Sequence, residues 1–440
     1  MAAKMMVLVA VLVCLAFVVA WAADEPAQVV TKEGAVATAG GTAKPGEATK
    51  SGEAVKGEEA KWVLAVEPKG LSENVKRGLS WLAEHQLKSG AWGQGEESTN
   101  MGGGAGLKDT PSVGDTCMAA LALVRSGSTP AKGDYRDAIR KAVEFVCSQV
   151  EESDQDSLKV TSTQGTRIQG KLGQNIDTFM ACLLLSEVKD RMVDKDGNDR
   201  VAKALDKVLH KMKVNQKENG TWGDQGWATA LAMNMGAKGY NRAAQSGAAV
   251  DEKVREKAEE YSRAQYDQSK GNFKAEGTAG VALYGSAGSL GAQSDSVNTN
   301  ATKEKEAGER LAKATTDDEK KDAQKDLDRY DQARKDLESS QKAVIAKLDD
   351  KQFIAGFGSN GGEEFLSYMN IGESLVVKGG DDWKKWDADI TKNLSGIQNS
   401  DGSWTGHHCI TGRTFCTSSA LLVLMVDRTP VPLAAKIGRR

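Results

Sequence analysis

The sequence predicts an all-α protein in which one layer of helices encloses another. Two observations predict this fold class. Helical segments with one polar face alternate with segments that are almost free of charge, and a corner motif recurs between them at a fixed spacing. A helix that is apolar around most of its circumference is buried on most sides. The uncharged segments are therefore expected inside, and the amphipathic segments outside, facing water.

The composition is that of a globular protein with nearly balanced charge. The 440 residues include 58 Lys and Arg against 61 Asp and Glu, which gives a formal net charge of -3. Such a chain has no field to attract nucleic acid or an anionic membrane, so no nucleic-acid partner is expected.

The first 22 residues have the pattern of a secretory signal peptide. Lys4 precedes the apolar run 5–19, which ends in the small-x-small sequence at 20–22. Residues 23–70 follow as a low-complexity tether, expected to be disordered because it has few large apolar side chains. No later stretch is long and apolar enough to be a transmembrane segment. A secreted, periplasmic or cell-surface protein is expected.

The helical domain is expected to occupy residues 71–284 and 352–428, with residues 429–440 as a C-terminal tail. Its amphipathic segments combine charges with apolar residues at helical spacing; they are 72–86, 135–150, 200–212 and 251–265. Its nearly uncharged segments are 116–124, 178–185, 228–235, 278–284, 365–377 and 417–426.

A Gln-x3-Gly-x-Trp motif joins outer helices to inner ones. Gly can adopt the left-handed conformation that ends a helix, the Gln amide can satisfy backbone groups, and the indole can pack between helices. The three copies are Gln86-Gly90-Trp92, Gln216-Gly220-Trp222 and Gln398-Gly402-Trp404, with weaker copies at Gln352-Gly356-Phe357 and Gly271-Asn272-Phe273.

This repeat resembles the prenyltransferase and squalene-oxidase repeat family, whose Gln-Trp repeats build an α/α toroid of about six helix pairs. The family includes terpenoid cyclases, protein prenyltransferase β-subunits and the thioester domains of alpha-macroglobulins. The resemblance covers residues 71–426 apart from one insertion, and it implies a toroid here.

The insertion is expected at residues 285–351. A Gly/Ser/Asn-rich stretch leads into a charged segment, where Thr316 and Glu319 form a capping box that opens a long helix. A partial heptad seam, typical of a coiled coil, follows at Leu327, Tyr330, Leu337, Val344 and Leu348. The expected form is a helical hairpin that either packs only on itself or serves as a partner-binding arm.

The motifs that carry chemistry in the family are mostly missing. The cyclase acid motifs D-x-D-D and D-C-T-A-E and the thioester motif G-C-G-E-Q do not occur. The prenyltransferase β-subunits bind zinc through Asp-x-Cys and a later His, and Asp115-Thr116-Cys117 has that form. His407 would complete such a set, although Arg413 stands where the family has its His. An N-capping Asp and a buried core Cys are the competing interpretation, and no cofactor is expected.

In a toroid all inner helices begin at one face, around the mouth of the central cavity. Positive helix ends there favour an anionic or polar group. The residues expected to border this mouth and to bind a ligand are Asp115, Asp177, Trp227, Thr229, His407, His408 and Arg413.

The expected function is that of an exported, non-catalytic binding or scaffolding protein whose partner is a protein or an apolar ligand. The alternative is an enzyme acting on an isoprenoid or other apolar ligand in the ring cavity, metal-assisted through Asp115, Cys117 and His407 or His408. An enzyme needs a deep apolar pocket. A scaffold can have its centre filled by side chains, for which the candidates are Met118, Phe179, Met233 and Met369.

Five cysteines follow the signal segment. Three of them, Cys117, Cys147 and Cys182, lie in apolar helical runs and are expected as buried thiols. Cys409 and Cys416 are close enough in sequence to form a local disulfide in an oxidising compartment, or to remain free.

Overall fold

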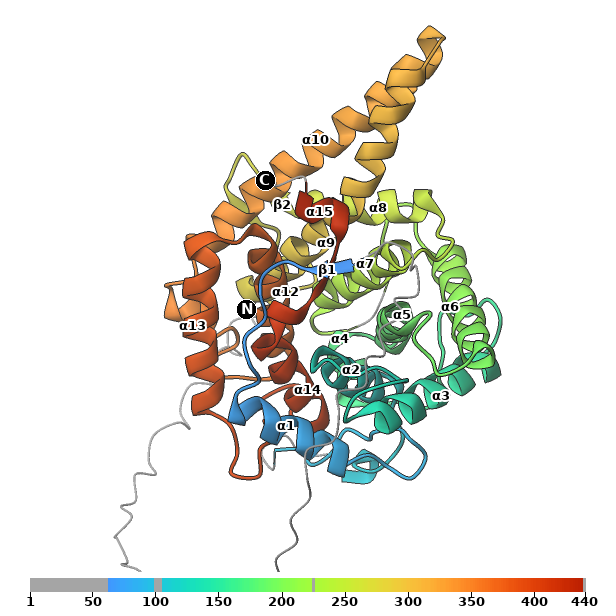
Figure 1. Cartoon of the computed structure of the whole chain (residues 1–440). Coiled ribbons are helices and arrows are strands. Elements are labelled where there is room, and N and C mark those ends of the chain that lie inside the picture. The colour runs from blue at the N-terminus through green and yellow to red at the C-terminus, as the bar shows by residue number, and fades with distance from the viewer. Residues whose placement is uncertain (1–61, 99–104, 224–225, 438–440) are drawn as a thin grey trace, which may run out of the picture. The chain divides into compact units, whose positions relative to one another are not determined.

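The structure is a computed structural model that describes residues 62–98, 105–223 and 226–437, all within the compact unit Gly57–Arg440. In this part of the chain the regular structure is almost entirely helical, with fifteen α-helices and four short strands (Figure 1). The prediction of an all-α fold is confirmed. None of the described helices combines the length and the apolar character needed to cross a membrane.

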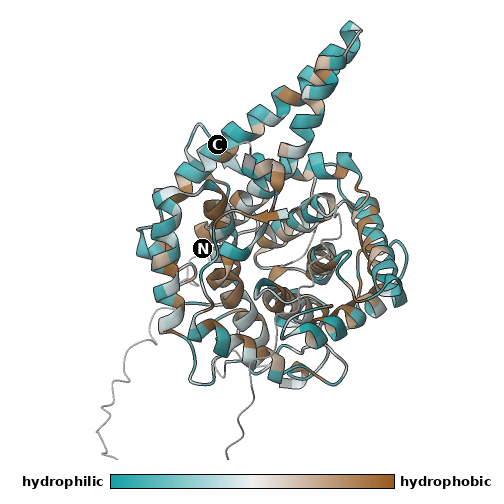
Figure 2. Cartoon of the chain, viewed as in Figure 1, coloured by the Kyte–Doolittle hydropathy of each residue, from teal (hydrophilic) through white to brown (hydrophobic). Residues whose placement is uncertain are grey.

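Six helices make up the buried layer, and in Figure 2 hydrophobic residues are concentrated on the central helices, whereas the outer helices carry more hydrophilic ones. They are α2 (Val113–Arg125), α5 (Ile176–Val188), α7 (Thr229–Gln245), α9 (Ala282–Lys313), α12 (Gly362–Lys378) and α14 (Arg413–Leu424). Their contacts form a closed series, because α2 packs on α5, α5 on α7, α7 on α9, α9 on α12, α12 on α14, and α14 again on α2.

More polar helices pack on the outside of this series. They are α1 (Glu73–Glu84), α3 (Arg136–Glu152), α6 (Lys195–Asn215), α8 (Glu252–Arg263) and α13 (Gly380–Gly396). Each contacts one or two inner helices: α3 packs on α2, α6 on α5, α8 on α7 and α9, α13 on α12 and α14, and α1 mainly on α14. The predicted alternation of outer and inner helices is therefore confirmed over these segments.

The three Gln-Gly-Trp corners have the same hydrogen bonds. Each indole Nε1 donates to the carbonyl ten residues earlier, at 2.8 Å in all three corners; the pairs are Trp92 with Leu82, Trp222 with Met212 and Trp404 with Leu394. Each Gln amide donates to its own corner Gly and to a carbonyl of the next outer helix. Those second acceptors are Ala138, Val254 and, for Gln398, Asn74 of α1.

The weaker copies of the motif do not repeat this geometry. Phe357 is 52% exposed, and its backbone N–H donates to Glu364. Phe273 lies in β3 (Asn272–Phe273), which pairs with β2 (Tyr266–Asp267). A phenyl ring has no N–H to donate, so these corners lack the hydrogen bond that the indoles make.

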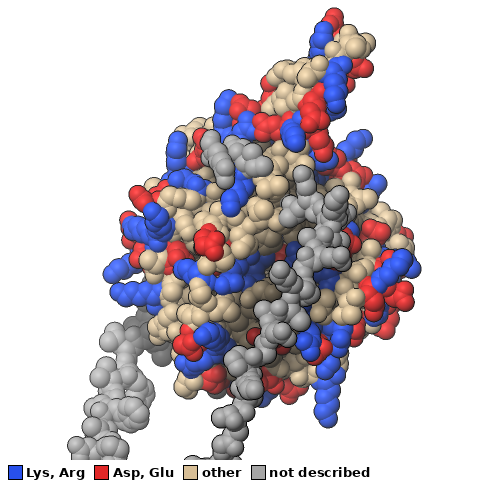
Figure 3. Space-filling view, viewed as in Figure 1, with Lys and Arg blue, Asp and Glu red and all other residues tan. Residues whose placement is uncertain are grey.

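The insertion begins later than the sequence predicted. Residues 285–300 continue the buried helix α9, so the Gly/Ser/Asn-rich stretch is not a lead-in segment. A Cβ on Gly291 would lie 3.0 Å from Asn370 and Asn234, which shows how closely the small residues let α9 approach its neighbours. The projecting part is the hairpin of the end of α9 with α10 (Asp317–Ile345), and the capping box of Thr316 and Glu319 is confirmed. Figure 3 shows Lys, Arg, Asp and Glu mixed over this arm.

The two ends of the described chain are joined to each other. Strand β1 (Trp62–Leu64) pairs antiparallel with β4 (Pro430–Pro432), and the amide of Lys69 donates to Asp427 at 2.7 Å. Residues 62–64, predicted as disordered tether, and 430–437, predicted as a tail, therefore form paired strands and a short helix of the folded unit. The predicted signal peptide, residues 1–22, and residues 23–61 of the predicted tether lie outside the described residues. The remaining short elements are α4 (Arg167–Leu172), α11 (Lys351–Ile354), α15 (Leu433–Ile437) and the 3₁₀ turns Ala105–Leu107 and Val426–Arg428.

A buried charge network joins the inner helices, with part of it near the C-terminal ends of α2, α5 and α7. Lys238 Nζ lies 2.5 Å from both Asp295 and Glu373, and Arg125 lies 2.7 Å from Glu187. Arg242 is 3.5 Å from Glu187 and covers one side of the Trp62 ring, while Arg191 lies over the same ring. Helix C-termini carry partial negative charge, which the excess of cations over carboxylates in this network offsets.

Candidate functional site

The N-terminal ends of the inner helices carry the opposite set of side chains. Asp115 and Asp177 lie in the first turns of α2 and α5, and Glu363 and Glu364 in the first turn of α12. Acidic groups there complement the partial positive charge of helix N-termini. We call this end of the inner helices the acidic end; it is the face on which the sequence placed the mouth residues.

Asp115 and Asp177 link two neighbouring helices. Asp177 accepts hydrogen bonds from the amide of Gly114 in α2 and from the Gln169 side chain, both at 2.8 Å. Asp115 accepts from the Ser112 hydroxyl at 2.7 Å, and Ser112 is the N-cap of α2. Asp115 is thus not the N-cap of its own helix. Burial, together with the Asp177 charge, raises the pKa of Asp115 to about 7, although the hydrogen bond from Ser112 acts to lower it.

Glu363, Glu364 and His408 form a second cluster at the acidic end. Their nearest ligand atoms all lie within 4.8 Å of one another. Glu363 is fully buried; one of its oxygens accepts from the Ile410 amide at 3.2 Å, and the other has no partner among the described residues. Burial and the adjacent Glu364 raise the pKa of Glu363 to about 8. Its carboxyl group is therefore mostly protonated at neutral pH.

Glu364 serves mainly as a helix cap. It accepts hydrogen bonds from the Tyr284 hydroxyl at 2.5 Å, the Phe357 amide at 3.0 Å and the Gly361 amide at 2.9 Å. His408 donates from Nε2 to the Ser359 carbonyl at 2.5 Å. Most of the polar atoms of this cluster are thus committed to the local fold.

These engaged atoms decide how well zinc would fit. Zinc is bound by at least three protein ligands with free lone pairs. At this cluster the unused atoms are one Glu363 oxygen and His408 Nδ1, so a bound zinc would displace the cap of α12. Among the described residues no other group of three such side chains has converging ligand atoms. The predicted set Asp115, Cys117 and His407 is therefore not brought together.

Two partly exposed aromatic rings lie on the same end, each beside a cationic or basic side chain. Trp227 is 47% exposed, with Lys171 Nζ 5.1 Å from its ring centre. Phe357 lies 5.2 Å from the His408 ring. Exposed aromatic rings of this kind are common anchors in binding surfaces.

The other predicted mouth residues have more ordinary surroundings. Arg413 begins α14 and pairs with Asp401 at 2.5 Å and Glu96 at 3.8 Å. Thr229 begins α7 and is half-buried, whereas His407 is exposed. All of the predicted mouth residues thus lie at inner-helix N-termini or in the loops before them. Of these residues, only His408 joins a group of three side chains whose ligand atoms converge.

Sequence reasoning missed Glu363, Glu364, Lys171 and Phe357. The signal was present for the two glutamates, because they directly precede the apolar run 365–377, as Asp115 and Asp177 begin their own helices. Starting the predicted helix at Phe365 left them outside it. Lys171 lies on the short helix α4, which the sequence analysis did not predict because its six residues are too few to show an apolar periodicity.

All five described cysteines have free thiols. Cys117, Cys147, Cys182 and Cys416 are buried in helices, and burial raises their pKa values. Cys416 donates a weak hydrogen bond to the Ile410 carbonyl. Cys409 and Cys416 are therefore both free and buried, and the hypothesis of a disulfide between them is not confirmed.

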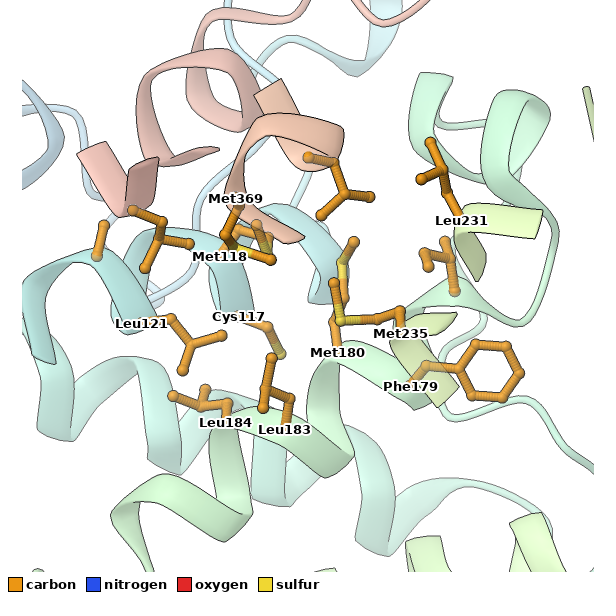
Figure 4. Packing of buried hydrophobic residues seen from close by; sticks show 14 of the residues in the cluster. Cys117, Met118, Leu121, Phe179, Met180, Leu183, Leu184, Leu231, Met235 and Met369 are labelled. Atoms are coloured by element: carbon orange, nitrogen blue, oxygen red, sulfur yellow. The ribbon is translucent and has the colours of Figure 1, made fainter. Parts of the chain in front are cut away.

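Side chains fill the centre of the inner layer. Figure 4 shows Met118 of α2 meeting Met369 of α12, with Met180 and Leu183 of α5 beside them. These four side chains are at most 3% exposed. Two other expected central residues point elsewhere: Phe179 packs on Trp222 at 5.4 Å between ring centres, and Met233 sulfur accepts from the Trp222 amide.

The raised pKa of Glu363 makes a testable difference to stability. The folded state holds this proton up to about pH 8, but the unfolded state releases it near pH 4.5. Stability is therefore lost as the pH rises between these values, by about 1.4 kcal/mol per pH unit from this group. Glu363→Gln should remove that loss. We expect urea unfolding at pH 5, 6.5 and 8 to show that the free energy of unfolding of the variant rises relative to that of the wild type at each step. A difference in unfolding free energy that does not change with pH would contradict the assignment.

No protein-family model matches this chain, and no curated protein matches it significantly.

Proposed function

We propose that this chain is an exported, non-catalytic binding protein built on an α/α toroid, and that it holds its partner at the acidic end. The closed series of contacts among the six inner helices and the three equivalent Trp corners support the toroid. The apolar run near the N-terminus supports export.

The observation that carries the proposal is the filled centre. An enzyme that encloses an apolar substrate needs a deep pocket with converging polar groups. Met118, Met180 and Met369 occupy that space here. The inner helices then act as a rigid core that presents groups at its ends, which favours binding at a surface over catalysis within a ring cavity.

The groups available at the acidic end suit a partner that lies across the surface. Trp227 and Phe357 are two of only four exposed large apolar side chains among the described residues; the other two are Val193 and Val214. Lys171 lies over the Trp227 ring, and His407 and Arg413 add polar side chains to the loops and helix start at this end. Aromatic anchors with a polar rim are typical of protein-binding surfaces.

A co-purification experiment tests the proposal. The tagged chain is recovered from the exported fraction, and its bound proteins are compared with those of the double variant Trp227→Ala/Phe357→Ala. We expect a specific partner to be lost in this variant, because truncating two anchor residues typically lowers affinity by about 100-fold or more.

The matched control is Val193→Ala/Val214→Ala, which removes the other two exposed apolar side chains. It should retain the partner. Loss of the partner in both double variants, or in neither, would contradict binding at the acidic end. Circular dichroism at 222 nm checks that each variant is folded.

A further inference from the structure

A pocket of about 280 Å³ lies on another part of the protein, where the end of α10 and the short helix α11 meet α13. Its apolar lining comes from Ile345, Leu348, Ile354, Trp386 and Ile390, and Asn393 adds a polar side chain. Trp386 and Ile390 are at most 5% exposed, and the other three are partly buried against the core. The pocket is thus a fixed feature of packed helices.

The rim of this pocket is acidic. It carries Asp349, Asp382 and Asp389 against a single cation, Lys385. Lys385 bonds to Asp349, and that hydrogen bond together with the Asp389 and Asp382 charges raises its pKa. Asp382 also pairs with Lys378 at 2.6 Å, whereas Asp389 makes no ion pair with any described residue. The rim therefore favours an ammonium group and disfavours a carboxylate.

We propose that this pocket binds a primary alkylammonium group, with the alkyl chain along the apolar side chains and the nitrogen beside Asp389, the rim carboxylate that has no ion pair with a described residue. A long aliphatic amine can bury its methylene groups while its charged end stays at a wet rim. The indole of Trp386 contributes its ring and not its N–H, because Nε1 faces Gly372 of α12.

Two sources could present this chemistry, a lysine side chain of a partner protein or a free alkylamine. The inference is independent of the function proposed for the acidic end, since it uses different residues and a different surface. Binding at one site can fail in experiment while binding at the other is observed.

The test is a titration of the full chain with hexylammonium. Binding is monitored through the NMR signal of the Trp386 indole N–H. The variant Trp386→Phe assigns that signal. We expect a saturable shift, with affinity rising about fourfold for each methylene from butylammonium to hexylammonium. Hexanol should bind about fivefold more weakly than hexylammonium. Hexanoate should bind more weakly still, because the rim repels it.

Variants at the rim separate the charge effect from simple hydrophobic uptake. Asp389→Asn should weaken hexylammonium binding about threefold to fivefold. Lys385→Gln should tighten it, because a competing ammonium group is removed. Asp381→Asn is the matched control: Asp381 lies on the same helix, is 99% exposed and does not line the pocket, so affinity should not change.

A third arm distinguishes the two sources. The third probe is Nα-acetyl-lysine N-methylamide, which keeps a free ε-ammonium group. If it binds as well as hexylammonium, the pocket is assigned to lysine side chains. If only hexylammonium binds, the pocket is assigned to free amines. The proposal is overturned if no saturable shift occurs, if hexanoate binds as well as hexylammonium, or if Asp389→Asn behaves like Asp381→Asn.

Discussion

Replacing Lys238 with Met is expected to lower the free energy of unfolding by about 3–5 kcal/mol. Lys238 is 1% exposed and lies between Asp295 and Glu373, which are themselves buried. Burial opposes its charge, yet these two carboxylates outweigh that cost and raise its pKa. Without the ammonium group, Asp295 and Glu373 would lose their closest cation and keep only Arg242 at 4.0 Å and Arg125 at 3.7 Å, respectively.

Chemical denaturation followed by circular dichroism measures this loss. The matched control is Lys213→Met. Lys213 forms an ion pair with Asp251, and its side chain is more than half exposed. It should cost less than about 1 kcal/mol.

Lys238→Met/Asp295→Asn should recover part of the loss, because Glu373 retains Arg125 at 3.7 Å as a cationic neighbour. A single Lys238→Met variant that is no less stable than Lys213→Met would show that the network does not hold the inner helices together.

Trp404→Ala is the second change with a large expected effect, and it should lower the free energy of unfolding by about 3–5 kcal/mol. The Trp404 indole is fully buried, donates to the Leu394 carbonyl, and packs against Gly78 of α1, where an added Cβ would lie 2.8 Å from the ring. This corner joins the last helix pair to the first helix. Its truncation should therefore loosen the contact between α14 and α1 as well as leave a cavity.

Two further variants separate packing from hydrogen bonding. Trp404→Phe keeps most of the ring but removes one of two donors to the Leu394 carbonyl, which also accepts from the Ile397 amide at 3.3 Å. The lost hydrogen bond should cost about 0.5–1.5 kcal/mol. Trp227→Ala removes a Trp that is 47% exposed and should change stability by less than about 0.5 kcal/mol. Hydrogen exchange should show faster opening of α1 in Trp404→Ala. Equal stability of Trp404→Ala and Trp227→Ala would contradict the structural role of the corner.

The sequence was sufficient for features that depend on residues close together in the chain. Apolar periodicity separated inner from outer helices, because a helix that faces water on one side must have a polar side. The capping box of Thr316 and Glu319 was also readable, because its four positions are local. The Gln-Gly-Trp corners belong to the same class, since each indole bonds a carbonyl only ten residues away.

Packing decided what local patterns could not. The stretch 285–300 has the small polar residues of a loop, yet it is a buried helix, because Gly291 lets α7 and α12 approach closely. The same limit applies to the acidic end, where Glu363 and His408 meet only after α12 and the loop before α14 have packed.

Sequence patterning thus determined which segments are helical and which of their faces are buried, since both depend on side chains a few residues apart. Tertiary structure alone determined how the ends meet, with Trp62 paired to Pro432, and which charges neutralise one another, as Lys238 does with Asp295 and Glu373. The physical reason is that these interactions join residues from 57 to several hundred positions apart. Their free energy depends on burial and distance in the folded chain, which no local pattern encodes.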